Sequence, residues 1–249
     1  LREADVIIAT CSFIEEFLEN KVGVDPKKII KVYPAVDDEI IDFKINMSKL
    51  NELKNKKGLE DKKVIFSCAR LIERKGIDNV IRALRRVVEN IPRVVYLIGG
   101  DGEYRSRLEC LVKENELNEY VKFLGNLNYE ELPYFYALCD VFIVPSRQLE
   151  NFDIEGFGMV YLEANALGKP VIGGNTGRTG DSIIDGVTGL RVNSEDLNSI
   201  ASAVIRILTD TDYARRLGEA GRRRAEKEFR WQDRADTIYQ ISQRIAKDY

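Results

Sequence analysis

Two glutamates, Glu155 and Glu163, enclose the glycine-containing stretch EGFGMVYLE. If a helix begins near Gly158, Glu155 lies in the preceding loop and Glu163 lies in the second helical turn. The two carboxylates would then reach different parts of one ligand, for example a sugar and a ribose. Glu163 stands among apolar residues, which a merely solvated glutamate does not need. The pair alone is weak evidence, because glutamate is frequent on helices.

A second segment, ARLIERKG at residues 69–76, places three cations just before a predicted helix. Free N–H groups at a helix N-terminus favour an anion, and Arg70 with Lys75 could add charge-assisted hydrogen bonds to a diphosphate. A solvated loop whose charges keep it exposed is the alternative interpretation. The segment alone does not decide between the two.

A third segment, GGDGE at residues 99–103, is a glycine-rich turn that would let a ligand approach the backbone. A tight turn without any ligand explains it equally well. The chain has no complete GxGxxG pattern followed by an acidic residue about twenty positions later, which argues against a Rossmann dehydrogenase.

The elements that must position these segments alternate between short apolar runs and longer helical patterns. This alternation predicts an α/β fold with a doubly wound, Rossmann-like parallel sheet. Ligands of such sheets bind outside the carboxyl ends of the strands, where the three segments fall. The predicted strands are 6–9, 29–33, 64–68, 94–98, 121–124, 141–144, 171–172 and 190–192, and the predicted helices are 12–20, 77–90, 103–116, 129–138, 158–167 and 196–209.

Changes in composition divide the chain into four predicted regions. Residues 1–35 form a separate strand, helix and strand, and residues 36–58 are a charged interdomain linker. Residues 59–228 form the α/β domain that would bind a ligand, and residues 229–249 are a terminal amphipathic helix.

Composition excludes several kinds of protein. The 38 Lys and Arg against 41 Asp and Glu give a net charge of −3, so no basic field indicates a nucleic-acid partner. With no histidine in the chain, the commonest zinc ligand and general base are absent. The four cysteines lack a CxxC pair and are interpreted as core thiols of a reducing compartment. No apolar run approaches the ~20 residues that span a bilayer, and we expect a cytoplasmic location.

Three segments in the same chain order carry a resemblance to a known family. The stretch EGFGMVYLEANALGKPVI at 155–172 resembles the two-glutamate signature of glycosyltransferase family 4, whose members are retaining enzymes with the GT-B fold. Residues 69–76 look like the family's GRLxxxKG loop, and DGVTGLRV at 185–192 looks like its DGxTGxLV turn. The long loop before Gly158 and the run GMVYLE at 158–163 look most like those of mannosyltransferases acting on phosphatidylinositol mannosides.

The resemblance implies a binding site for a nucleotide-diphosphate sugar, the donor. Arg70 and Lys75 would bind the diphosphate, Glu163 the ribose hydroxyls and Glu155 the transferred sugar. Arg70, Lys75 and Glu155 are therefore the predicted catalytic residues, and no metal is expected. Leu127 would hold the nucleobase through its main chain. Further backbone donors are expected from Phe157, Gly158, Met159 and Val160.

The implied reaction moves a hexose from a GDP-mannose or UDP-glucose type of donor to a lipid or glycan acceptor. The acceptor hydroxyl would attack on the face from which the phosphate leaves, so the anomeric configuration is retained. Residues 1–35 resemble the end of an N-terminal acceptor domain, and we expect catalysis to need that missing domain. A non-catalytic nucleotide-sugar-binding module and a GT-B sugar phosphorylase remain as alternatives.

Two further features bear on the expectation. The family often has a GGxPE run where this chain has GNTGRTGD at 174–181, so the sugar contacts expected there are open. The run Arg222–Arg224 permits a peripheral membrane contact, although adjacent glutamates make a solvated helix face the alternative.

Overall fold

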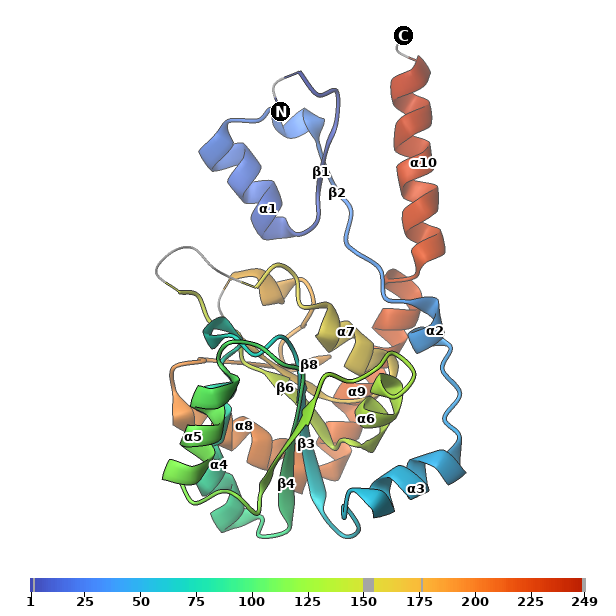
Figure 1. The fold of residues 1–249 in the computed structure, drawn as a ribbon. Coiled ribbons are helices and arrows are strands. Elements are labelled where there is room, and N and C mark those ends of the chain that lie inside the picture. The colour runs from blue at the N-terminus through green and yellow to red at the C-terminus, as the bar shows by residue number, and fades with distance from the viewer. Residues whose placement is uncertain (2, 150–154, 176, 248–249) are drawn as a thin grey trace.

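The central feature is a parallel sheet of six strands in the spatial order β5-β4-β3-β6-β7-β8 (Figure 1). The computed structural model describes residues 1, 3–149, 155–175 and 177–247. This strand order confirms the predicted doubly wound α/β fold. The strands are β3 (Lys63–Cys68), β4 (Val94–Gly99), β5 (Val121–Gly125), β6 (Val141–Val144), β7 (Val171–Gly174) and β8 (Gly189–Val192).

Helices cover both faces of the sheet, as the doubly wound pattern requires. One face carries α4 (Ile77–Asn90), α5 (Arg105–Glu114) and α8 (Leu197–Thr209). The other carries α6 (Leu132–Leu138) and α7 (Met159–Ala166), and α9 (Thr211–Glu228) packs on α7 and α8. No helix in the described ranges is long and apolar enough to cross a bilayer.

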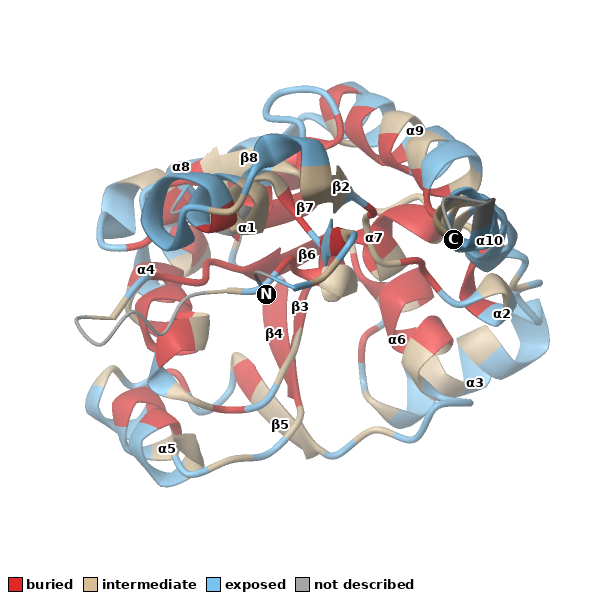
Figure 2. Ribbon diagram, turned by 90° about the horizontal axis from the view of Figure 1, so that it is seen from above, coloured by how far each residue is buried: buried red, intermediate tan, exposed pale blue. Residues whose placement is uncertain are grey.

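The strands alternate their side chains between two buried clusters. Figure 2 shows that β4 is coloured as buried. In β3, Val64 and Phe66 enter the cluster beneath α6 and α7, whereas Ile65 enters the cluster beneath α4 and α8. Such side chains stay apolar because both faces of the strand are dry. Burial of every residue in β4 and β6 agrees with their uninterrupted apolar sequences.

A small N-terminal unit precedes the sheet. It consists of β1 (Ile7–Ala9), α1 (Ser12–Phe17), the π-helical continuation Leu18–Val22, a 3₁₀ turn Pro26–Lys28 and β2 (Ile29–Lys31), and β1 pairs parallel with β2. The predicted helix 12–20 thus changes its hydrogen-bonding pattern part-way. Figure 1 places this unit over the edge of the sheet that bears the strands' carboxyl ends.

The segment predicted as a linker is more ordered than a flexible connection. It contains α2 (Asp38–Ile41) and α3 (Met47–Lys56), and α3 packs on α6. Ile40 and Ile41 are buried beside Phe229, and the Val36 N–H donates to the Phe229 carbonyl at 2.8 Å. The last helix, α10 (Trp231–Lys247), then runs alongside the N-terminal unit (Figure 1).

Candidate functional site

The loops after β3 and β6 meet where the sheet changes the direction of its strand order. β3 and β6 are neighbours, yet the chain leaves β3 toward β4 on one side and β6 toward β7 on the other. Open α/β sheets bind ligands at such a point. Gly76 makes the contact possible: its φ is +70°, and a Cβ built there would lie 2.2 Å from the Pro145 carbonyl oxygen. Only glycine fits this close approach.

The carboxylate of Glu155 lies within a cradle of donors from both loops. It accepts from Lys75 Nζ at 2.5 Å, from Ser146 Oγ at 2.9 Å and from Arg74 at 3.2 Å. Glu155 keeps 12% of its side-chain surface exposed and Lys75 keeps 13%. The structure therefore brings together two residues predicted for the site, Glu155 and Lys75, and adds Arg74 and Ser146, to which the sequence had assigned no separate role.

The cradle sets the charge state of Glu155. Burial by itself raises the pKa of the carboxyl, but the charge and hydrogen bond of Lys75, the Ser146 hydroxyl and the charge of Arg74 outweigh it. The resulting pKa is below the ordinary value. Glu155 is thus held as an anion that faces cations. A phosphate or a polarised sugar hydroxyl bound here would share these charged groups with the protein's own contacts.

The N-terminus of α7 opens beside this cradle. Gly158 is the N-cap residue with φ +88°, and no side chain caps the helix. The N–H groups of residues 157–160 donate no hydrogen bond to another described residue. Free N–H groups and the helix dipole together favour an anion here. The start of α7 at Met159 confirms that Glu155 precedes the helix and that Glu163 lies in its second turn.

Glu163 occupies a different environment from Glu155. Its carboxylate accepts from the buried Tyr136 hydroxyl at 2.7 Å. Burial raises the pKa of Glu163, the Tyr136 hydrogen bond lowers it, and the charge of Asp37 raises it further, so the pKa lies above the ordinary value. The two glutamates therefore have different partners and opposite pKa shifts, as suits contact with different parts of one ligand.

The remaining predicted residues lie around this centre. Arg70 is exposed and forms no hydrogen bond or ion pair with any described residue. It lines a hollow of about 420 Å³ together with Arg74, Gly102 and Leu149. Leu127 lies against Gly99, where an added Cβ would be 2.9 Å from the leucine methyl. The 99–103 turn thus has a packing role at Gly99, independent of any ligand.

Phe157 was predicted only for its backbone, yet its ring has a structural role. The ring is buried and packs against Tyr33 at 5.6 Å and Phe229 at 6.1 Å between ring centroids. These contacts join the residue before the N-cap of α7 to the segment that follows β2 and to the end of α9. The loop that carries Glu155 is therefore anchored on its downstream side.

Arg147 is a buried cation in the loop after β6 whose charge is already paired. Its guanidinium donates two hydrogen bonds of 3.1 Å to Asp78 and one of 3.2 Å to Glu73, and 8% of the side chain is exposed. These bonds connect the loop after β6 to α4 and leave little unpaired charge for a ligand. Within the described ranges, no group of three or more Cys, Asp or Glu side chains is placed to hold a metal ion.

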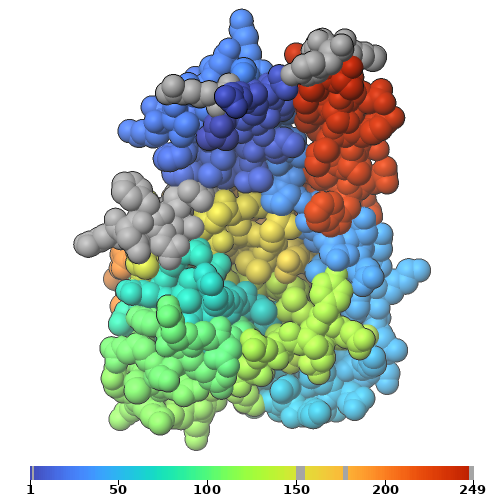
Figure 3. Space-filling view, turned by 45° about the horizontal axis from the view of Figure 1, so that its top comes forward, coloured from blue at the N-terminus to red at the C-terminus, as the bar shows by residue number. Residues whose placement is uncertain are grey.

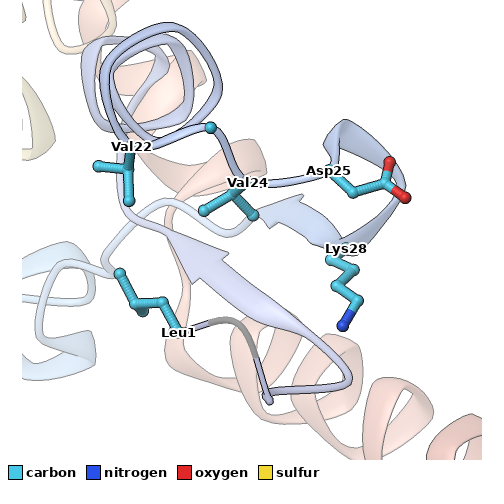
Figure 4. Close-up of a pocket in the computed structure, with 6 residues that line it drawn as sticks. Leu1, Val22, Val24, Asp25 and Lys28 are labelled. Atoms are coloured by element: carbon cyan, nitrogen blue, oxygen red, sulfur yellow. The ribbon is translucent and has the colours of Figure 1, made fainter.

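Two other surface features are separate from this site. A hollow of about 400 Å³ in the N-terminal unit, lined partly by Val22, Val24 and Lys28, contains none of the predicted site residues (Figure 4). On α9, Arg222 and Arg224 form i,i+4 ion pairs with Glu226 and Glu228. The Arg222 side chain is 55% exposed, as on a solvated helix face, whereas the Arg224 side chain is only 12% exposed and belongs to the interior contacts of α9.

The cysteines agree only partly with their interpretation as core thiols. Cys11 and Cys139 are buried and Cys68 is half-buried, whereas Cys110 is exposed. Cys110 lies on α5 outside the buried face of that helix, so the interpretation was wrong for this residue.

A model of the family described as glycosyl transferases group 1 matches residues 50–224. The chain belongs to this family. The match spans every strand of the large sheet and each predicted donor-site residue. It confirms the glycosyltransferase resemblance that the three sequence segments indicated.

Known relatives and structures agree with the family assignment. The chain is 35% identical over 190 residues to a GDP-mannose-dependent alpha-(1-6)-phosphatidylinositol monomannoside mannosyltransferase of Mycolicibacterium smegmatis, covering 76% of this chain and 50% of that protein. The chain thus spans about half the length of the curated relatives it matches. A glycosyltransferase from Rickettsia africae has a TM-score of 0.88 at 20% identity over 98% of this chain and 64% of its own. HepE from Anabaena, solved with UDP and glucose, has a TM-score of 0.83 at 22% identity with the same coverage. These two structures confirm the GT-B type of fold.

Proposed function

We propose that the chain is the donor-binding part of a retaining hexosyltransferase that uses a nucleotide-diphosphate sugar and acts on a lipid or glycan acceptor. The observation that carries the proposal is the meeting of Glu155, Lys75 and the open N-terminus of α7 at the reversal of the strand order. Membership of the glycosyl transferase group 1 family supports it.

In the proposed complex, charge on the leaving diphosphate is stabilised without a metal. Lys75 and Arg70 donate to the phosphate oxygens, and the N–H groups at the start of α7 add neutral donors. Lys75 is already paired with Glu155, so the phosphate shares this cation with the carboxylate rather than meeting a bare charge. Glu155 is then oriented by Ser146 to accept from a hydroxyl of the transferred sugar.

The nucleoside end of the donor is assigned to the opposite side of α7. Glu163 accepts from the ribose hydroxyls, and Tyr136 fixes the direction of its carboxylate. Leu127 lies at the nucleobase. GDP-mannose is the first donor to test, because a similar relative is named as dependent on it, and UDP-glucose is the second because HepE binds UDP and glucose.

The acceptor is assigned to the side of the N-terminal unit, which lies over the carboxyl ends of the strands. The chain spans about half the length of the relatives it matches, and we assign acceptor binding and complete turnover to the whole protein rather than to this chain by itself. We assign the protein to the cytoplasmic side of a membrane, where a nucleotide sugar and a lipid acceptor can meet.

Calorimetric titration of the chain with GDP-mannose, UDP-glucose and ADP-glucose tests the proposal, in buffer containing EDTA and again with Mg²⁺. We expect one donor to bind in both buffers with a Kd in the micromolar to millimolar range. Binding of free phosphate and hexose but of no nucleotide sugar would favour a phosphorylase instead. Binding of the donor only with Mg²⁺ would overturn the metal-free assignment.

A further inference from the structure

Asp181 joins the α/β domain to the N-terminal unit. It follows the 3₁₀ segment Gly177–Gly180 after β7. Its carboxylate accepts from the Ser12 backbone N–H at 2.6 Å, from the Ser12 hydroxyl at 2.9 Å and from the Tyr33 hydroxyl at 3.1 Å. Every one of these donors belongs to a segment about 150 or more residues away in the chain.

The hydrogen bonds to Ser12 complete the N-terminus of α1. Ser12 is the first residue of this helix, and its own N-cap residue, Cys11, provides no side-chain hydrogen bond. The first N–H groups of a helix need an acceptor, and an anion there is also favoured by the helix dipole. Asp181 therefore caps α1 from a distant part of the chain, in place of a local N-cap side chain. Lys31 donates to the same Ser12 hydroxyl at 3.0 Å.

The backbone that carries Asp181 is held from behind by α9. Arg224 donates to the carbonyl oxygens of Asp181 at 2.7 Å and Ser182 at 3.1 Å. The Arg224 side chain is 12% exposed, and its guanidinium lies over the Phe229 ring at 5.0 Å. These contacts fix the Arg224 guanidinium, and its two hydrogen bonds in turn fix the backbone that carries the Asp181 carboxylate.

The other end of the contact leads back to the donor site. The ring of Tyr33 packs on Phe157, two residues beyond Glu155 and directly before the N-cap of α7. The space-filling view shows the N-terminal unit resting on the segment that contains α7 (Figure 3). Tyr33 therefore contacts both Asp181 and the residue directly before the N-cap of α7.

We propose that Asp181 is a positioning residue. From the α/β domain it caps α1 of the N-terminal unit, and so fixes that unit over the donor site. The proposal rests on the proposed function for its role in sugar transfer, whereas the capping itself does not. It gives a role to the 174–181 segment, in which the chain departs from the pattern usual in the family it resembles.

Hydrogen exchange of the unliganded chain tests the capping directly. In Asp181→Ala we expect the amides of α1 to exchange about tenfold faster or more, because a charge-assisted bond is lost, while the amides of β6 and β7 keep their protection. Asp181→Asn retains one accepting oxygen and should restore part of the protection. Tyr33→Phe removes only the 3.1 Å bond and should show a smaller increase.

Asp196→Asn is the matched control, since Asp196 caps α8 within the α/β domain by accepting from the Asn198 N–H at 2.9 Å. It should leave α1 unchanged. Unchanged exchange of α1 in Asp181→Ala would overturn the proposal. Equal loss of protection in α1, β6 and β7 would also overturn it, because Asp181 would then support the domain as a whole.

Donor binding separates this proposal from the proposed function. Asp181→Ala should leave the donor Kd of the chain unchanged, because no predicted donor contact is altered. In transfer to an acceptor by the whole protein, it should lower kcat while the donor KM stays constant. A raised donor KM at constant kcat would contradict the positioning role. If no donor binds to the wild-type chain, the proposed function fails, and the exchange experiment still decides the capping.

Discussion

The carboxylate of Glu155 and the ammonium of Lys75 lie 2.5 Å apart although 80 residues separate them in the chain. The pair joins the loop after β3 to the loop after β6, and it does so at the reversal of the strand order. In the unliganded chain it is a largely buried ion pair, and with a donor bound the same ammonium would also face the diphosphate. The pair is thus a structural contact and a donor-binding contact at once.

Lys75→Ala should weaken donor binding about tenfold or more, because a charge-assisted hydrogen bond to phosphate is lost. Lys75→Arg should retain part of the affinity, since the charge remains while the geometry changes. Lys113→Ala, at an exposed position on α5, is the control of equal charge change. Calorimetry of the three variants checks this, and equal weakening by Lys75→Ala and Lys113→Ala would indicate only a general charge effect.

Gly76→Ala should destabilise the chain by at least about 3 kcal/mol, because the left-handed backbone disfavours a side chain and the new Cβ would collide with Pro145. Gly58→Ala is the control, since Gly58 also has a positive φ of 61° but meets only the tip of Lys122 at 3.9 Å. It should cost about 1 kcal/mol. Urea unfolding measures both, and similar losses would show that the contact with Pro145 is not tight.

Acid should weaken the chain partly through Glu155. Its folded pKa is below the unfolded value, so its contribution to the free energy of unfolding is fully present above the unfolded value of about 4.3 and is lost as pH falls through the folded pKa. Glu155→Gln should flatten this part of the pH profile and lower stability at neutral pH by about 3 kcal/mol, since it leaves buried cations without a carboxylate. Unfolding by urea from neutral to acidic pH gives both quantities. If the free energies of unfolding of wild type and Glu155→Gln changed with pH in parallel, the ion pair and hydrogen bonds assigned to the Glu155 carboxylate would be contradicted.

The contribution of Glu163 to stability should change with pH in the opposite direction to that of Glu155. Its folded pKa is raised, so its charged form opposes folding above that pKa, and the penalty is relieved as pH falls. Glu163→Gln should therefore leave the unliganded chain equally stable or more stable at neutral pH, while weakening donor binding about tenfold. Thermal unfolding with and without donor tests the two effects together. A variant that was less stable and bound the donor normally would show that Glu163 serves the fold.

The sheet was predictable because its strands are apolar on both faces. In β3, β4 and β6, the apolar run alone indicated where each strand ends and the next loop begins. Glu155 and Lys75 could be placed at the same edge for that reason. Their partners could not: Ser146 and Tyr136 have no distinguishing neighbours in sequence, and their hydroxyls acquire meaning only when folding brings them to a glutamate.

Asp181 shows the same limit more clearly. Its three hydrogen bonds reach Ser12 and Tyr33, and no spacing along the chain reveals a cap supplied from so far away. Arg147 shows the reverse case, because this cation in the loop after β6 is already paired with Asp78 and Glu73. The sequence shows that a residue is charged, but it does not show whether that charge is already paired in the folded chain.

The central claim is that Glu155 contacts the sugar of the donor and Glu163 contacts its ribose. Titration of wild type, Glu155→Gln and Glu163→Gln with GDP-mannose and with GDP, or with the corresponding pair if another donor binds, tests it most directly. We predict that Glu155→Gln abolishes the affinity difference between the nucleotide sugar and the nucleotide, whereas Glu163→Gln weakens both ligands by the same factor of about ten. Equal weakening of both ligands by Glu155→Gln, or loss of the sugar-dependent difference in Glu163→Gln, would contradict the assignment.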